Sequence, residues 1–197
     1  VQTSGTSVTL EEVFFLDAST GWACGQDGTI LQTADGGNSW NAQSTPDDRN
    51  LYSIHFTDSN TGFAVGAQAM IIGTTDGGSS WSFINEGGSF SDTLYNSINF
   101  SEADHGWIAG NDGLVLATKD GGATWTRQQS QTTVDLNAVW FVNNQTGWAV
   151  GENGALMKTS TGGEIPVGIE PESGDNPAIA ESYVLYQNYP NPFNPVT

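Results

Sequence analysis

Three nearly identical stretches place an aspartate and two glycines before a tryptophan: "TADGGNSW" (33–40), "TTDGGSSW" (74–81) and "TKDGGATW" (118–125). A repeated carboxylate of this kind could act as a general acid or base, or bind a cation. Asp and Gly are also the residues that tight turns select, because an Asp side chain can accept N–H bonds from its own turn. We therefore expect Asp35, Asp76 and Asp120 to hold their own turns, and we predict no catalytic residue, no cofactor and no metal ligand.

The other reactive side chains form no recognisable site. No stretch has the alternating Asp spacing with a distal Glu that wraps one calcium ion. His55 lies on an apolar strand and His105 in a turn of another repeat, which disfavours a shared metal or a catalytic dyad. Cys24 is the only cysteine, so no internal disulfide can form, and its neighbours in "GWACG" favour a small core residue.

Charge limits the partners. Only Arg49, Lys119, Arg127 and Lys158 are basic, against 22 carboxylates, which gives a formal net charge of -18. Long-range repulsion excludes nucleic acid and acidic lipid surfaces as partners. No apolar run approaches the roughly 18 residues that a membrane helix needs, so we expect no membrane insertion.

The elements that position these residues repeat four times. Glycines before an aromatic recur at Gly21, Gly62, Gly106 and Gly147, spaced by 41, 44 and 41 residues. Before each of these glycines, apolar residues occupy alternate positions, as Val13 and Phe15 do. After each glycine come two short apolar runs and one polar run. Four short strands per unit of about 40 residues are typical of β-propeller blades. We therefore predict an all-β fold, a β-propeller with four visible four-stranded blades that belong to a larger propeller, followed by an irregular Pro-rich tail.

The repeats give the domain boundaries. We expect the end of a preceding repeat or a closing strand at 1–9, blade 1 at 10–50, blade 2 at 51–93, blade 3 at 94–135 and an incomplete blade 4 at 136–168, then a linker at 169–182 and a C-terminal segment at 183–197. "VQTSGTSVTL" aligns with "RQQSQTTVDL" (127–136), so the first residues either supply the strand that blade 4 lacks or follow blades outside this sequence. We favour the second interpretation, which predicts an open arc of four blades.

One position of the first strands could serve binding. Phe14, His55, Asn99 and Trp140 occupy the same place and face away from the apolar alternation. If the first strand is innermost, these side chains approach the channel or the neighbouring blade, and packing between blades is the explanation we favour for Phe14 and Trp140.

The eight-residue motif resembles the Asp-box, or BNR repeat, and the whole repeat resembles that of the photosystem II stability and assembly factor family. The resemblance covers residues 8 to about 163 and implies the propeller fold strongly and an activity weakly. The positions that match the box are Thr33, Asp35, Gly37, Trp40, Thr74, Asp76, Gly78, Trp81, Thr118, Asp120, Gly122 and Trp125.

The Asp-box also occurs in sialidases and in xyloglucan-degrading propeller glycosidases, so a hydrolase fragment is the alternative. A sialidase needs an arginine cluster, and only Arg49 and Arg127 are present, in different repeats. A glycosidase needs two paired carboxylates. Six acids are available but nothing in the sequence pairs them: Asp17, Asp47, Asp48, Asp58, Glu102 and Asp104.

The C-terminal "YVLYQNYPNPFNPVT" resembles the start of the C-terminal sorting domain of type IX secretion substrates. The matching positions are Leu185, Gln187, Asn188, Tyr189, Pro190, Asn191, Pro192, Phe193, Asn194, Pro195 and Thr197. The resemblance implies export by the type IX machinery to the medium or outer surface of a Gram-negative cell. We therefore expect a secreted, non-catalytic propeller that binds a protein or polysaccharide.

Overall fold

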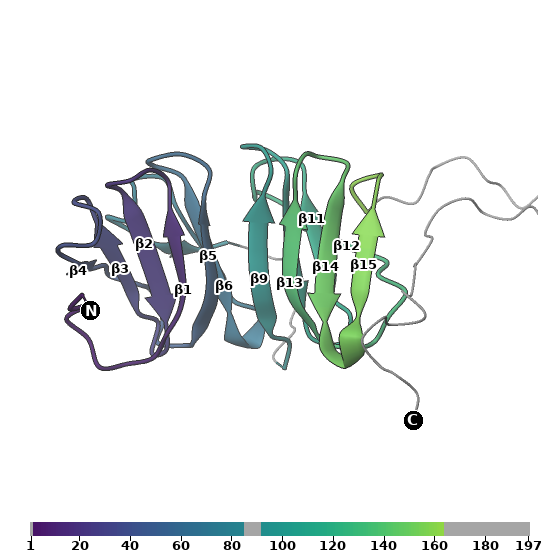
Figure 1. The fold of residues 1–197 in the computed structure, drawn as a ribbon, viewed down its shortest axis with the longest axis horizontal. Helices are drawn as coiled ribbons and strands as arrows, with labels where there is room; N and C mark the ends of the chain where they lie inside the picture. The colour runs from purple at the N-terminus through teal and green to yellow at the C-terminus, as the bar shows by residue number, and fades with distance from the viewer. Residues whose placement is uncertain (1, 85–91, 164–197) are drawn as a thin grey trace, which may run out of the picture.

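The computed structural model describes residues 2–84 and 92–163, which form four antiparallel sheets in chain order (Figure 1). Blade 1 contains β1 (Leu10–Phe15), β2 (Gly21–Gly25), β3 (Ile30–Thr33) and β4 (Asn41–Ala42). Blade 2 contains β5 (Leu51–Phe56), β6 (Gly62–Gly66), β7 (Ile71–Thr74) and β8 (Ser82–Phe83), with a 3₁₀ turn η1 (Ala67–Ala69). Blade 3 contains β9 (Tyr95–Phe100), β10 (Gly106–Gly110), β11 (Val115–Thr118) and β12 (Thr126–Gln128).

Blade 4 contains β13 (Leu136–Phe141), β14 (Gly147–Gly151) and β15 (Leu156–Thr159), with a 3₁₀ turn η2 (Glu152–Gly154). The described part of this sheet has three strands, whereas the other three sheets have four. The predicted open arc agrees with the arrangement in Figure 1, where blades 1 and 4 lie at opposite ends of the row. No helix in residues 2–84 and 92–163 has the length and apolarity needed to cross a membrane.

In each blade the glycine that begins the second strand lies against the ring of the phenylalanine that ends the first strand. Gly21 is paired with Phe15, and Gly62, Gly106 and Gly147 are paired with the equivalent phenylalanines in the other blades. A Cβ atom added at any of these glycines would lie less than 3.0 Å from that ring. The repeated glycine is therefore required by the close approach of an aromatic side chain to the backbone.

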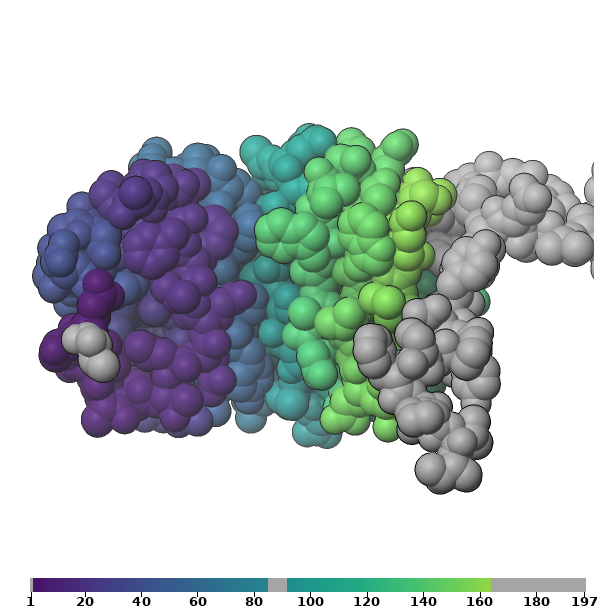
Figure 2. Space-filling view, viewed as in Figure 1, coloured from purple at the N-terminus to yellow at the C-terminus, as the bar shows by residue number. Residues whose placement is uncertain are grey.

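The core consists of three joints between successive blades, each formed by one face of a blade and the opposite face of the next. Figure 2 shows the blades from outside, with blade 1 (purple) and blade 4 (green) toward opposite ends. An aromatic ring from the second strand of one blade stacks on the phenylalanine that ends the first strand of the next. The stacked pairs are Trp22 on Phe56 at 3.5 Å, Phe63 on Phe100 at 4.7 Å and Trp107 on Phe141 at 3.5 Å. Since a single blade cannot bury both faces, these joints hold the arc together.

Hydrogen bonds between first strands add to each joint. The Glu12 carboxylate accepts the Ile54 N–H at 2.7 Å, the Ser53 hydroxyl accepts the Ile98 N–H at 3.0 Å, and the Ser97 hydroxyl accepts the Val139 N–H at 3.2 Å. Burial raises the pKa of Glu12, against the lowering effect of its bonds to Ser53 and Ile54. These three positions are equivalent in the repeat, so a polar residue at this place links neighbouring first strands.

Candidate functional site

The Asp-box aspartates are saturated by their own turns. Asp35 Oδ1 accepts the Thr33 hydroxyl at 2.8 Å and the Ser39 N–H at 2.9 Å, and Oδ2 accepts the Ser39 hydroxyl at 2.6 Å. Thr33 Oγ1 in turn accepts the Gly37 N–H at 2.8 Å, where the backbone has a φ of 85° that favours glycine.

The second and third boxes repeat this geometry. Asp76 is bonded to Thr74 and Ser80, and Asp120 to Thr118 and Thr124. The Ser39 hydroxyl makes the largest contribution to lowering the pKa of Asp35 to about 2, and the Ser80 hydroxyl does the same for Asp76. The Thr124 hydroxyl likewise lowers the pKa of Asp120. Carboxylates held this firmly in the ionised form are poor general acids or bases near neutral pH.

The box tryptophans cover the phenylalanine at the end of the first strand of their own blade. Each indole meets the ring edge-on: Trp40 with Phe15 at 6.1 Å, Trp81 with Phe56 at 5.8 Å and Trp125 with Phe100 at 5.9 Å. In blade 4 the sequence places Pro166 at this register, outside the described residues. Phe141 stacks on Trp107 of blade 3 and meets no edge-on tryptophan from the described part of its own blade.

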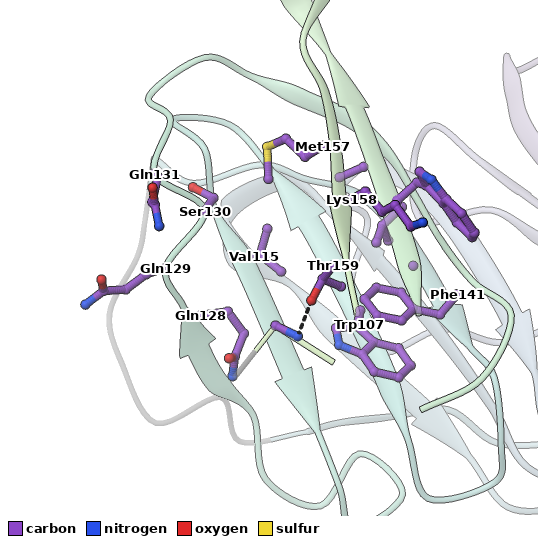
Figure 3. Close-up of a pocket in the computed structure, with 15 residues that line it drawn as sticks. Trp107, Val115, Gln128, Gln129, Ser130, Gln131, Phe141, Met157, Lys158 and Thr159 are labelled. Atoms are coloured by element: carbon purple, nitrogen blue, oxygen red, sulfur yellow. Dashed lines mark hydrogen bonds between the residues drawn. The ribbon is translucent and has the colours of Figure 1, made fainter. Parts of the chain in front are cut away.

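A pocket lies at this place, between blades 3 and 4 (Figure 3). It has about 60 Å³ of interior space, and the stacked Trp107 and Phe141 form one wall. The other apolar side chains that line it are Val115, Val139, Trp148, Ala149 and Met157. The polar residues that line it are Gln128, Gln129, Ser130, Gln131, Lys158 and Thr159.

Hydrogen bonds fix the walls of the pocket. Trp107 Nε1–H donates to the Gly162 carbonyl at 2.9 Å, just as Trp22 donates to the Gly77 carbonyl at 3.2 Å between blades 1 and 2. Thr159 Oγ1 accepts the Gly163 N–H at 3.0 Å, the bond drawn in Figure 3. The apolar floor and amide-rich rim suit an apolar group that enters partway, since about 60 Å³ is less than the space that a whole aromatic ring fills.

Three of the four residues at the inner-strand position singled out by sequence contact the neighbouring blade. Phe14 packs against His55 at 4.7 Å and Phe56 at 6.4 Å, and Asn99 is buried with its carbonyl bonded to the Phe141 N–H at 2.8 Å. Burial lowers the pKa of His55 to about 4. Trp140 is 61% exposed, because no blade in the described chain lies beyond blade 4, so its packing against a neighbouring blade stays a prediction.

The remaining reactive side chains are a buried cysteine and an exposed cluster of two acids and a histidine. Cys24 is buried and reduced, and burial raises the pKa of its thiol. Glu102, Asp104 and His105 bring possible ligand atoms within 4.8 Å of one another in an exposed turn, where His105 Nδ1 and Asp104 Oδ1 are already hydrogen-bonded at 2.7 Å. Sequence reasoning missed this group and the pocket, although the loss of the box tryptophan in the last repeat was a visible signal for the pocket. The sorting-motif residues 185–197 lie outside the described residues.

A family profile described as "Photosynthesis system II assembly factor YCF48" matches residues 39–137, half of the chain, across the repeats described above. The chain belongs to the YCF48 family. Comparison with curated protein sequences gives no significant match.

Solved structures of YCF48 share the β-propeller fold. "YCF48 bound to D1 peptide" is 24% identical with a TM-score of 0.65, covering 83% of this chain and 52% of the other. YCF48 from Cyanidioschyzon merolae is 19% identical with a TM-score of 0.65, covering 77% and 50%. The chain thus spans about half the length of the YCF48 structures that it matches. A GH74 enzyme from Niastella koreensis is 16% identical with a TM-score of 0.64, covering 79% and 29%, which is a likeness of fold alone.

Proposed function

We propose that this protein is a non-catalytic β-propeller that binds a segment of a partner protein through an aromatic side chain, held in the pocket between blades 3 and 4. The observation that carries the proposal is that the fourth repeat has no box tryptophan in its sequence and that the described residues form a pocket over Phe141. Trp81 and Trp125 cover Phe56 and Phe100 in blades 2 and 3, whereas in blade 4 the pocket stands over Phe141.

The chemistry of the pocket favours a polypeptide as its occupant. Its apolar walls can receive the edge of an indole or phenyl ring, and burying aromatic surface is a main source of affinity in many protein interfaces. The rim of Gln128, Gln129 and Gln131 offers amide donors and acceptors to a peptide backbone. The solved YCF48 structure with a D1 peptide supports peptide binding as a capacity of this fold.

A hydrolase remains the alternative because GH74 enzymes share the fold. Against it, the carboxylates of all three boxes are bonded within their own turns, and Glu12, whose pKa is raised, uses its carboxylate to accept the Ile54 N–H. Neither the box aspartates nor Glu12 therefore supplies the two free carboxylates, one acting as acid and one as base or nucleophile, that a glycosidase needs.

The test is a library of immobilised random peptides probed with the full chain, beside a glycan panel assayed for reducing-sugar release. We expect bound peptides to be enriched in Trp, Phe or Tyr, and binding to be lost when that residue is changed to Ala. Met157→Gln, which places an amide in the pocket, should abolish binding.

Leu156→Gln is the matched control, because neighbouring strand residues point to opposite faces of β15. Binding that survives Met157→Gln, or peptides with no aromatic preference, would refute the pocket assignment. Turnover of a glycan that a single Asp or Glu substitution abolishes would replace the proposal with the hydrolase.

We also propose that the protein reaches the cell surface through its C-terminal motif. The support is the sequence match at residues 185–197, which gives the type IX machinery as a second partner. In a Gram-negative host that has this route, replacing Pro190, Pro192 and Pro195 by Ala in the gene should leave the protein inside the cell. Unchanged surface delivery of that variant would exclude this motif as the signal.

A further inference from the structure

The joint between blades 2 and 3 differs from its two neighbours in the residue that the second strand contributes. In the other two joints a tryptophan occupies this place and donates its indole N–H to a glycine carbonyl of the next blade, at 3.2 and 2.9 Å. In the joint between blades 2 and 3 the residue is Phe63, which has no N–H to donate. The equivalent acceptor, the Gly121 carbonyl, therefore receives no hydrogen bond from the part of the chain that the structure describes.

The third and fourth strands of blade 2 also differ at this joint. Gly73 on β7 pairs with Phe63, at the place where blade 1 has Gln32. Ile84 stands at the place of Gln43, whose amide donates to Gln32 Oε1 at 3.1 Å in blade 1. A glycine and an aliphatic residue thus replace a bonded pair of amides, which removes side-chain volume and hydrogen-bonding groups from this joint.

A surface groove of about 270 Å³ lies at this place, between the outer strands of blade 2 and the Asp-box of blade 3. It shares no lining residue with the pocket between blades 3 and 4. None of the described residues that line it is charged, in a chain whose formal net charge is -18. The residues that bring hydroxyls to it are Thr61, Thr74, Thr75, Ser80 and Ser82.

Several polar groups of the groove have hydrogen-bonding capacity left. The exposed hydroxyls of Thr75 and Ser82 make no hydrogen bond to another described residue. The Ser80 hydroxyl donates to Asp76 Oδ2 at 2.6 Å, so its oxygen can still accept a bond. With the Gly121 carbonyl, the groove therefore offers two free hydroxyls and two acceptors beside its apolar residues.

We infer that this groove binds one ring of a neutral sugar. Its ligand must bring a donor to the Gly121 carbonyl, polar groups to the free hydroxyls, and an apolar side to Phe63 and Ile84. A pyranose ring meets these conditions, because its hydroxyls both donate and accept while its C–H groups are apolar. The volume is close to the lower end of the ~300–1,000 Å³ range of small-molecule sites, which suits a single ring.

Charge restricts the class of sugar. The groove has no cationic side chain among its described lining residues, and the net charge of -18 repels anions over long distances. Sugars that carry a carboxylate or a sulfate should therefore not bind. The site is separate from the peptide pocket, so it adds a second ligand to the proposed function.

The experiment is an NMR titration of the isotope-labelled full chain with the methyl glycosides of glucose, galactose, mannose and N-acetylglucosamine, one at a time. We expect at least one of the four to give saturable shifts at the methyl groups of Ile84 and Ala123 and at the amides of Gly121 and Gly122. Methyl glucuronide, which carries a carboxylate, should give none. The inference is overturned if none of the four neutral glycosides saturates these shifts, or if the glucuronide binds equally well.

A variant that copies blade 1 tests the position of the site. Gly73→Gln combined with Ile84→Gln rebuilds the amide pair, and the nearest atom to a Cβ added at Gly73, at 2.7 Å, is the end of the Ile84 side chain that the second substitution replaces. The double variant should fold and lose the sugar-induced shifts of the two box amides. Ala117→Gln is the matched control, because Ala117 is the equivalent of Gly73 in blade 3, and it should keep those shifts.

Phe63→Trp is a second variant, in case the double variant does not fold. It supplies the indole that the other two joints use, so it should occupy the Gly121 carbonyl and abolish sugar binding. Sugar binding that persists in either variant, when the variant shows native circular dichroism, would contradict the inference.

The peptide pocket and the groove can fail independently. Met157→Gln should leave the sugar-induced shifts unchanged, because Met157 does not line the groove, and loss of those shifts in a natively folded Met157→Gln variant would overturn the assignment to the groove. Saturable shifts of the groove residues with N-acetyltryptophanamide, and with none of the four glycosides, would make the groove a peptide site and would also overturn it.

Discussion

His55 gives the protein a pH-dependent loss of stability with a defined window. Its ring lies between Phe14 at 4.7 Å and Phe100 at 5.9 Å, and burial lowers its pKa from 6.5 to about 4. Because the folded-state pKa is lower than the unfolded one, the unfolded chain takes up the proton first as pH falls. The contribution of His55 is therefore fully present above the unfolded pKa and is lost as pH falls from about 6.5 toward 4.

The size of the effect follows from the two pKa values. Between pH 7 and pH 4.5 the linkage relation gives a loss of about 2 kcal/mol in the free energy of unfolding. Other groups titrate nearby with different signs, since the pKa of Glu12 is raised and that of Asp58 is lowered. A comparison between variants is needed because it cancels these contributions.

The assay is urea unfolding of the wild type and of His55→Phe at a series of pH values. Phenylalanine is chosen because Phe14 occupies the equivalent position in blade 1. The wild type should lose about 2 kcal/mol relative to the variant between pH 7 and 4.5. A constant difference between wild type and His55→Phe over this pH range would refute the reasoning.

Three further outcomes are expected. Asp76→Ala should lower the melting temperature by several degrees, because the Thr74 hydroxyl and the N–H and hydroxyl of Ser80 lose the carboxylate that accepts their hydrogen bonds. Asp48→Ala should leave the melting temperature unchanged in the same calorimetric scan. Trp107→Phe should reduce the free energy of unfolding by about 2 kcal/mol, because the bond to Gly162 and part of the buried ring area are lost. The control Trp140→Phe, at an exposed position, should change it by less than about 0.5 kcal/mol. Equal effects of the two variants in denaturant titrations would contradict the stabilising role of Trp107 between blades 3 and 4. Cys24 should resist a thiol reagent in the native protein and react after unfolding, and rapid native-state labelling followed by mass spectrometry would place this thiol at the surface.

The strands of the fold could be predicted because their signals are local. The alternation of Ile54 and Phe56 indicates a strand with one buried face, and Gly62 marks the start of the next strand. The all-β propeller class, predicted from four such units, is confirmed by the sheets and by the solved propellers that the chain resembles.

The joints between blades could not be predicted residue by residue. The bond from Trp22 to Gly77 and the bond from Ile54 to Glu12 connect residues far apart in sequence, and their pairing depends on how one blade rotates against the next. The pocket is a feature of the same kind, since it arises from a residue type that the fourth repeat lacks. Only the comparison of that repeat with its neighbours gave a sign of it.

The central claim is that the pocket between blades 3 and 4 accepts an aromatic side chain. The most direct measurement is an NMR titration of the methyl groups of the full chain with N-acetyltryptophanamide, the free equivalent of the residue found in the other boxes. The account predicts saturable shifts at Val115, Val139, Ala149 and Met157 that Met157→Gln removes and Leu156→Gln retains. Shifts that do not saturate, or that centre on another part of the arc, would contradict it.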